Sequence, residues 1–172
     1  GHAECVQLLI AANADLEAKD EEEMTALLWA ARSGHTSCLQ MLVASKVNLE
    51  AQDRNGKTAI ILATENDNDA CVEVLAASNA DLDARAEHDM TALMIAAYDG
   101  HAASVQALLA ARASIDAKDE YDRTALISAV ERDHAECAKL LIDANADLEF
   151  KDDEGESALL CAAKNGGTEC TQ

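Results

Sequence analysis

The stretch Thr25-Ala26-Leu27-Leu28-Trp29-Ala30-Ala31 decides the fold of this chain, because its opening tripeptide returns at regular intervals. TAL begins at Thr25, Thr91 and Thr124, TAI begins at Thr58 and SAL at Ser157, so successive starts lie 33 residues apart without insertion or deletion. A fixed period of roughly 20 to 50 residues indicates stacked copies of one supersecondary unit. The sequence therefore predicts a repeat array.

Two further sets of positions keep the same register. The first holds mainly histidine and the second mainly leucine: His2, His35, Asn68, His101, His134 and Gly167, and Leu16, Leu49, Leu82, Ile115 and Leu148. The repeat is thus 33 residues long throughout, and we expect all 172 residues to form a single array.

Within one unit the pattern predicts two short helices. A threonine such as Thr25 can cap a helix through its hydroxyl, and the Ala/Leu run that follows propagates the helix. Gly34 interrupts this run, and residues 35–44 then place Cys38, Leu39, Met41 and Leu42 at helical spacing. We expect this second helix to pack back on the first.

A chain reversal and a loop complete the unit. Asparagine tolerates the left-handed conformation that a reversal after a helix requires, and Lys and Arg tolerate it less well. We expect reversals at Asn13, Lys46, Asn79, Arg112 and Asn145. The following stretch, for example residues 14–24, is polar apart from one inward leucine, which predicts an extended, hairpin-like loop.

These columns resemble the ankyrin repeat, whose pattern runs D-x-x-G-x-T-P-L-H-x-A-A-x-x-G-H. Residues 53–58 (DRNGKT) and 30–35 (AARSGH) match it best. The resemblance covers essentially the whole chain and implies an all-α ankyrin-repeat solenoid of helix-turn-helix units with hairpin-like loops. It implies full repeats at about 19–51, 52–84, 85–117 and 118–150, and partial repeats at 1–18 and 151–172.

The chain departs from the family pattern at three positions. Alanine replaces the proline and an apolar residue replaces the first histidine in every unit, so the first helix loses its pre-set start and its polar bracing. The turn glycine is kept at Gly56 and Gly155 but replaced by Glu23, Asp89 and Asp122, where we expect looser hairpins. This scatter favours a natural, divergent array over a consensus design. Because neither end supplies a polar capping repeat, we also expect a piece of a longer chain that frays at both ends.

The composition limits the partners. With 33 acidic and 13 basic residues, the formal net charge is −20. Such a surface repels phosphate backbones, so we expect no nucleic acid and no anionic membrane surface as partner. Apolar runs such as residues 26–31 are far shorter than the roughly 20 residues of a membrane helix. We expect no direct membrane insertion and an intracellular, cytoplasmic location.

The six cysteines follow the repeat. One column contains five of them with a serine in the gap, and the sixth lies outside: Cys5, Cys38, Cys71, Ser104, Cys137 and Cys170, and separately Cys161. Residues of one column lie about 10 Å apart, which exceeds the separation that a disulfide spans. The thiols are therefore expected to be free, small packing residues in a reducing compartment.

No motif predicts chemistry. The H-x-x-C pairs, such as His35 and Cys38, offer two ligands each, whereas a structural zinc needs four, so we expect no metal site. The same separation between repeats disfavours a Cys/His catalytic pair. No phosphate-binding glycine motif occurs, and residues 53–56 and 152–155 are interpreted as turns rather than calcium loops. We expect no cofactor and no enzymatic activity.

The resemblance also implies where a partner binds. In ankyrin arrays the hairpin tips and the exposed ends of the first helices line a concave groove. The positions carried over to this chain are rich in Arg, Tyr and Met, which are enriched at interfaces. The groove candidates are Met24, Arg32, Arg54, Lys57, His88, Met90, Tyr98, Tyr121, Arg123 and Arg132, and they include both tyrosines of the chain.

Two hypotheses for the function remain open. The first is a protein–protein interaction module, or scaffold, that binds a partner protein through the groove. The second is a structural or regulatory segment of a larger multi-subunit assembly, channel or enzyme, held through its flanks and ends. All the hairpin-tip and helix-end positions that the resemblance assigns to the groove together hold ten acidic and six basic residues. Their mixed charge does not decide between these hypotheses.

Overall fold

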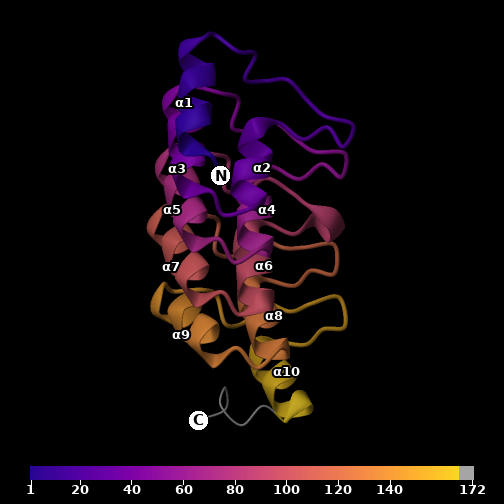
Figure 1. Ribbon diagram of the computed structural model, residues 1–172. Coiled ribbons are helices and arrows are strands. Elements are labelled where there is room, and N and C mark those ends of the chain that lie inside the picture. Colours follow the sequence, from indigo (N-terminus) through magenta and orange to yellow (C-terminus); the bar gives the residue numbers. More distant parts are fainter. Residues whose placement is uncertain (167–172) are drawn as a thin grey trace.

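The computed structural model describes residues 1–166, and these residues form two layers of short helices (Figure 1). The inner layer contains α2 (Ala26–Arg32), α4 (Ala59–Glu65), α6 (Ala92–Asp99), α8 (Ala125–Glu131) and α10 (Ala158–Asn165). The outer layer contains α1 (Ala3–Ala11), α3 (Thr36–Ala44), α5 (Asp69–Ala77), α7 (Ala102–Ala110) and α9 (Ala135–Asp143). A 3-10 helix, η1 (Glu87–Asp89), lies in one loop.

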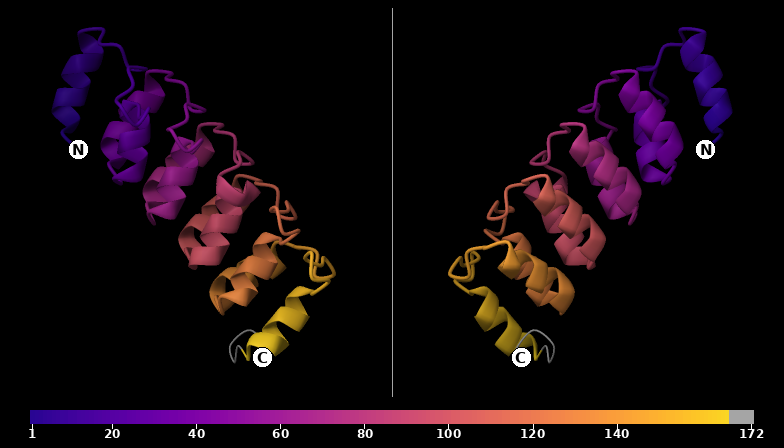
Figure 2. Two further views of the ribbon diagram at one scale, coloured as in Figure 1. Left: turned by 90° about the vertical axis from the view of Figure 1, so that its right-hand side faces the viewer. Right: turned by 90° about the vertical axis from the view of Figure 1, so that its left-hand side faces the viewer.

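The helix pairs follow one another in single file, and all the long loops project on one side (Figure 2). Each inner helix contacts the inner helices before and after it, and each outer helix does the same in its own layer. The prediction of an all-α solenoid is therefore confirmed.

Threonine caps open most of the inner helices. The Thr25 hydroxyl accepts a hydrogen bond from the Leu28 N–H at 3.3 Å, and Thr91 and Thr124 make the equivalent bonds at 3.3 and 3.4 Å. At Thr58 the cap bond is missing and the buried hydroxyl has no partner among the described residues. The caps provide a defined helix start where the family's proline is absent.

The core runs without interruption along the stack, between the two layers. Of the five apolar residues at the family's first histidine position, Leu28, Ile61, Met94 and Ile127 are at most 1% exposed, whereas Leu160 on α10 is 54% exposed. Burying one such side chain stabilises the fold by about 1.5–3 kcal/mol. Apolar burial thus stabilises these inner helices in place of the polar contacts of the family's histidine. The alanines on the inner helices let neighbouring repeats approach closely.

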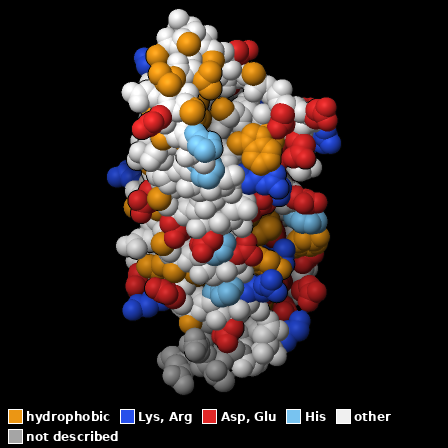
Figure 3. Space-filling view, viewed as in Figure 1, with side chains coloured by type: hydrophobic (Ala, Val, Ile, Leu, Met, Phe, Trp, Pro, Cys, Tyr) orange, Lys and Arg blue, Asp and Glu red, His pale blue; other side chains and the backbone are white. Residues whose placement is uncertain are grey.

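Polar side chains connect successive repeats at the seam between the layers, where Figure 3 shows a column of histidines. The Asn68 amide donates to the carbonyl oxygens of Ala31 and Arg32 at 2.9 and 3.0 Å, and His101 Nδ1 lies 2.9 Å from the Thr64 carbonyl oxygen. Each bond joins the start of an outer helix to the inner helix of the preceding repeat, α5 to α2 and α7 to α4. Side chains of the histidine column thus join successive repeats at these two positions.

The chain reversals and the loops also follow the predicted pattern. All five residues at the reversals are left-handed: Asn13, Lys46, Asn79, Arg112 and Asn145 have φ of 57°, 60°, 60°, 67° and 66°. Each loop ends in a hairpin closed by a backbone bond between its first and fifth residues, and we number these hairpins 1 to 5: residues 20–24, 53–57, 86–90, 119–123 and 152–156.

An aspartate organises the tip of a regular hairpin. The Asp53 carboxylate accepts hydrogen bonds from the backbone N–H groups of Asn55 and Lys57, both at 2.9 Å. Asp20 and Asp119 do the same in hairpins 1 and 4. The expectation of looser hairpins at Glu23 and Asp122 is therefore wrong.

These two replacements of the turn glycine adopt left-handed φ values of 60° and 58°. The aspartate bonds hold the tip in place, so a residue other than glycine tolerates the position.

Hairpin 3 is the exception, because Ala86 stands at the aspartate position. Two successive residues, His88 and Asp89, have φ near 60°, and the tip forms η1 instead of the regular turn. Backbone bonds join the tips of hairpins 1 and 2, 3 and 4, and 4 and 5 at 3.0–3.1 Å. Within residues 1–166 no equivalent bond joins hairpins 2 and 3. The missing carboxylate thus explains the irregular tip.

We predict that Asp53→Ala lowers the free energy of unfolding by about 1–2 kcal/mol, because two backbone N–H groups lose their acceptor. Asp53→Asn keeps an acceptor oxygen and should stay within about 0.5 kcal/mol of the parent. Conversely, Ala86→Asp should stabilise the chain by about 1 kcal/mol. Urea unfolding measures all three, and an unchanged stability of Asp53→Ala would contradict the role assigned to the aspartate.

A second prediction concerns the turn between α6 and α7. Gly100 has φ of +81°, and a Cβ atom there would lie 2.7 Å from the His134 ring. Gly100→Ala should therefore cost about 1–3 kcal/mol of backbone strain plus the cost of the steric contact. Gly56→Ala is the matched control, since its φ is +76° with nothing within 4 Å of the added Cβ. Equal losses of thermal stability in the two variants would argue against the contact with His134.

Candidate partner-binding groove

The hairpin tips and the adjoining ends of the inner helices form one continuous side of the molecule, which we call the groove. A first hollow of about 460 Å³ lies between hairpins 1 and 2 and the ends of α2 and α4. Two adjoining hollows, beside Tyr98 and Arg132 and beside Tyr121 and Arg123, share Glu131 and Asn165 in their walls. We call these two hollows together the trough. Charged and apolar side chains alternate on this side in Figure 3.

In the first hollow, cations are held by neighbouring acids. Lys57 contacts Glu65 at 2.7 Å, and Arg32 lies 3.8 Å from Glu22. The Arg54 guanidinium donates to the backbone carbonyl oxygen of Glu21, which connects the tips of hairpins 1 and 2. Hairpin 2 is thus tied both to hairpin 1 and to α4.

Trp29 is a groove residue that the sequence analysis missed. The residue is 42% exposed, its Nε1 donates to Asp20 at 2.8 Å, and Arg32 lies over the ring at 5.4 Å from the centroid. The bond from Trp29 is the main reason why the pKa of Asp20 lies below its usual value. Trp29 shares a repeat column with apolar residues such as Leu62, so its position indicated core. The one signal was that it is the sole tryptophan of the chain.

Both tyrosines are stacked with an arginine. Arg132 lies 4.2 Å from the ring centroid of Tyr98, and Arg123 lies 4.8 Å from that of Tyr121. The ring of His88 is 6.1 Å from that of Tyr121, and His88 also contacts Glu120. Such contacts stabilise the ring orientation at low cost in side-chain entropy, which suits residues that anchor a partner.

Arg123 connects hairpin 4 to α8. Its guanidinium contacts the Asp119 carboxylate at 2.8 Å and Glu131 at 3.3 Å. Asp119 is almost completely buried, so this pair is shielded from solvent. Both acids contribute to raising the pKa of Arg123 against the opposing effect of burial. The tip that presents Tyr121 is therefore fixed on the body of the array.

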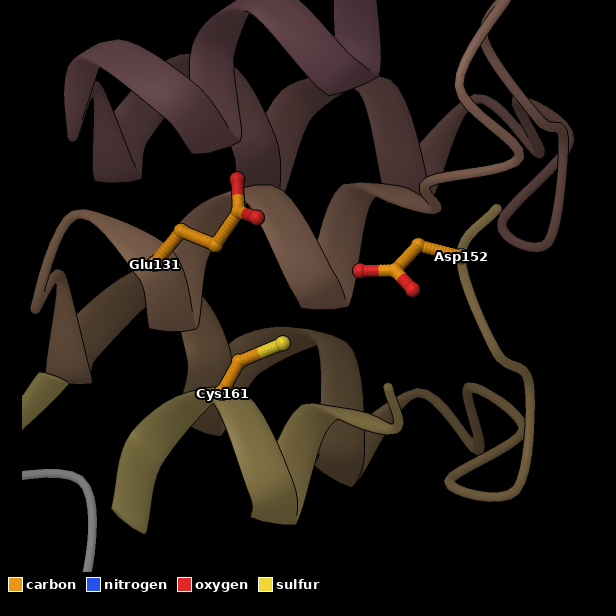
Figure 4. Close-up of side chains that lie close together, drawn as sticks. All are labelled: Glu131, Asp152 and Cys161. Carbon is orange, nitrogen blue, oxygen red and sulfur yellow. The ribbon is translucent and has the colours of Figure 1, made fainter. Parts of the chain in front are cut away.

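Below hairpin 4, Glu131 from α8, Asp152 from hairpin 5 and Cys161 from α10 converge, with their ligand atoms within 4.8 Å of one another (Figure 4). Burial, and to a smaller extent Asp152, raises the pKa of Glu131. Burial also raises the pKa of the Cys161 thiol to about 11. Arg123 neutralises part of the negative charge of Glu131. The remaining negative charge of the two carboxylates makes this cluster the acidic floor of the trough. The absence of a metal site stays a prediction.

Eight of the ten predicted groove residues lie on this side: Arg32, Arg54, His88, Tyr121 and Arg132 are exposed, and Lys57, Tyr98 and Arg123 are half-buried. Met90, the last residue of hairpin 3, is half-buried and packs against the core. The prediction that Met24 offers its side chain to a partner is wrong, because this last residue of hairpin 1 is 2% exposed and packs in the core. Methionine supports the hairpin there instead of offering a surface to a partner.

The cysteines of the described residues are free thiols, and Cys38, Cys71, Cys137 and Cys161 are buried whereas Cys5 is exposed. This confirms the packing role expected of the cysteine column at three of its members. Cys170 lies outside the described residues.

These features define a solenoid of helix-turn-helix repeats whose hairpins project on one side and whose apolar core continues from repeat to repeat. Comparison with known protein families gives a match over most of the chain. The family described as ankyrin repeats (3 copies) matches residues 1–86 and 93–172. The chain belongs to the ankyrin-repeat family, whose members generally serve as protein–protein interaction modules and are typically not enzymes. No curated protein matches the chain. None of the described helices is long and apolar enough to cross a membrane.

We predict that the Cys161 thiol of the folded protein resists alkylation at pH 8. With a pKa of about 11, roughly one thiol in a thousand is ionised at that pH, and burial blocks access to the remainder. Exposed Cys5 serves as the reactive control in the same sample. Mass spectrometry after iodoacetamide treatment should find Cys5 modified and Cys161 modified only after unfolding. Comparable rates at both positions would contradict the assigned burial.

Proposed function

We propose that this ankyrin array is a protein-interaction module, or scaffold, that docks a partner protein in the groove. The observation that carries the proposal is the set of three arginine–aromatic stacks along one side of the stack, at Trp29, Tyr98 and Tyr121. Tryptophan, tyrosine and arginine are the residue types most often found as energetic anchors of protein interfaces. Few aromatic residues occur in the chain, and three of its four lie here.

Rigidity of the groove supports the same function. Arg123 fixes hairpin 4 to α8, and the aspartates of hairpins 1, 2 and 4 hold their tips. Backbone bonds join hairpin 1 to hairpin 2, and hairpin 4 to hairpins 3 and 5. A preorganised surface loses less side-chain and loop entropy on binding. The free thiols buried in the described residues further favour the proposed intracellular, cytoplasmic location, because thiols persist in reducing compartments.

A second candidate function is a structural or regulatory segment of a larger assembly, held through its ends. Exposed leucines support it: Leu8 and Leu9 on α1 are 70% and 57% exposed, and Leu159 and Leu160 on α10 are 75% and 54% exposed. Cross-linking mass spectrometry in native extracts separates the two candidates. Cross-links at the hairpins favour the interaction module, whereas cross-links at α1 and α10 favour the assembly segment.

We predict that Tyr98→Ala combined with Tyr121→Ala weakens binding of the native partner by about 10- to 100-fold, because two aromatic anchors of the groove are lost. Ile142→Ala, which truncates an exposed apolar side chain on outer-layer α9, is the control and should leave the affinity within about twofold. Affinity is measured by calorimetry, after circular dichroism has verified the fold of each variant. An unchanged affinity of the double tyrosine variant would rule out this docking site.

A further inference from the structure

The charge of the groove is not uniform along the stack. Three carboxylates and three cationic side chains line the first hollow. By contrast, seven carboxylates and three cationic side chains line the trough. The first hollow is therefore balanced in charge, whereas the trough has an excess of four negative charges.

The cations of the trough are already engaged within the chain. Arg123 is held by Asp119 and Glu131, and Lys164 contacts Glu156 at 3.0 Å and Glu154 at 3.5 Å. Arg132 stacks on the ring of Tyr98. An acidic partner would have to compete with these contacts, so the trough offers it little attraction.

Three carboxylates of the trough are in the opposite situation. The side chains of Asp99, Asp133 and Asp153 are exposed, and within residues 1–166 none of them has a hydrogen-bond or ionic partner. They come from three different segments: the end of α6, the turn after α8, and the tip of hairpin 5. A cationic side chain of a partner would pair with these carboxylates without breaking any ion pair within the chain.

The aromatic rings of the trough add a second contribution. Tyr121 is 40% exposed at the mouth of the trough, and Tyr98 lies in the wall of the hollow that contains Asp99 and Asp133. Lysine and arginine side chains bind carboxylates through their heads and pack their apolar stems along aromatic rings. The trough combines both types of group.

We infer that the trough receives a lysine- or arginine-rich segment of the partner, so that the partner's basic end lies over α8 and α10 and its neutral part over α2 and α4. This inference rests on the proposed function, in which the groove is the docking surface, and it adds the chemistry and the direction of the bound segment. The net charge of −20 adds long-range attraction for such a segment, and the trough gives that attraction a place to act.

The test uses a synthetic peptide of alternating lysine and serine, its glutamate counterpart, and two charge-matched triple variants. Asp99→Asn, Asp133→Asn and Asp153→Asn remove the unpaired carboxylates of the trough. Glu73→Gln, Glu136→Gln and Asp143→Asn remove the same charge from exposed positions on the outer-layer helices α5 and α9. Binding is measured by calorimetry at roughly physiological salt, where long-range attraction is screened.

We expect the lysine peptide to bind, the glutamate peptide not to bind, and the trough variant to weaken binding of the lysine peptide by about tenfold. The outer-layer variant should change the affinity less than about twofold. Equal weakening by both variants, equal binding of both peptides, or no binding of the lysine peptide would overturn the inference.

The inference and the proposed function fail in distinguishable ways. A native partner that cross-links to the hairpins through an acidic segment would overturn the inference and leave the proposed function intact. A lysine peptide that binds the trough, together with a native partner that cross-links only to α1 and α10, would overturn the proposed function alone.

Discussion

Each repeat depends on its neighbours to bury the inner helix, and this contact underlies the rest of the structure. Helices of seven to nine residues are too short to be stable alone in water. They persist because residues such as Leu28, Ile61 and Met94 are enclosed between the layers and between successive repeats. The same stacking brings equivalent positions of successive repeats to the same side, so the hairpins form a single continuous surface.

Hydrogen bonds within and between repeats position that surface. The Asp53 carboxylate shapes the tip of its own hairpin, whereas the bonds from Asn68 and His101 join one repeat to the next. Where the carboxylate is missing, at Ala86, both the regular tip and the bond to the preceding hairpin are lost. The aspartate at the first position of a hairpin therefore determines whether its tip is regular, and hairpin 3 is the least regular of the five.

Periodicity was sufficient to predict the fold but not the details of the groove. The helices, the threonine caps and the left-handed reversals at residues such as Asn13 follow from local sequence and the repeat register. Trp29 was missed because its column holds buried residues, most of them apolar, in the other repeats. Met24 was assigned to the groove because its position lies next to the hairpin tip, yet its side chain turns inward. The pairing of Arg123 with Asp119 and Glu131 depends on distances between segments, which a linear pattern does not contain.

The polarity of the groove likewise emerges only in three dimensions. A count over groove positions gives a mixed surface, whereas the hollows divide into one with balanced charge and an acidic trough. The most direct test of a partner-binding groove is hydrogen–deuterium exchange of the chain, free and bound to its native partner. Binding should slow exchange at the tips of the hairpins and leave the outer-layer helices α3, α5, α7 and α9 unchanged. Slower exchange confined to the outer layer, with unchanged hairpins, would contradict the account.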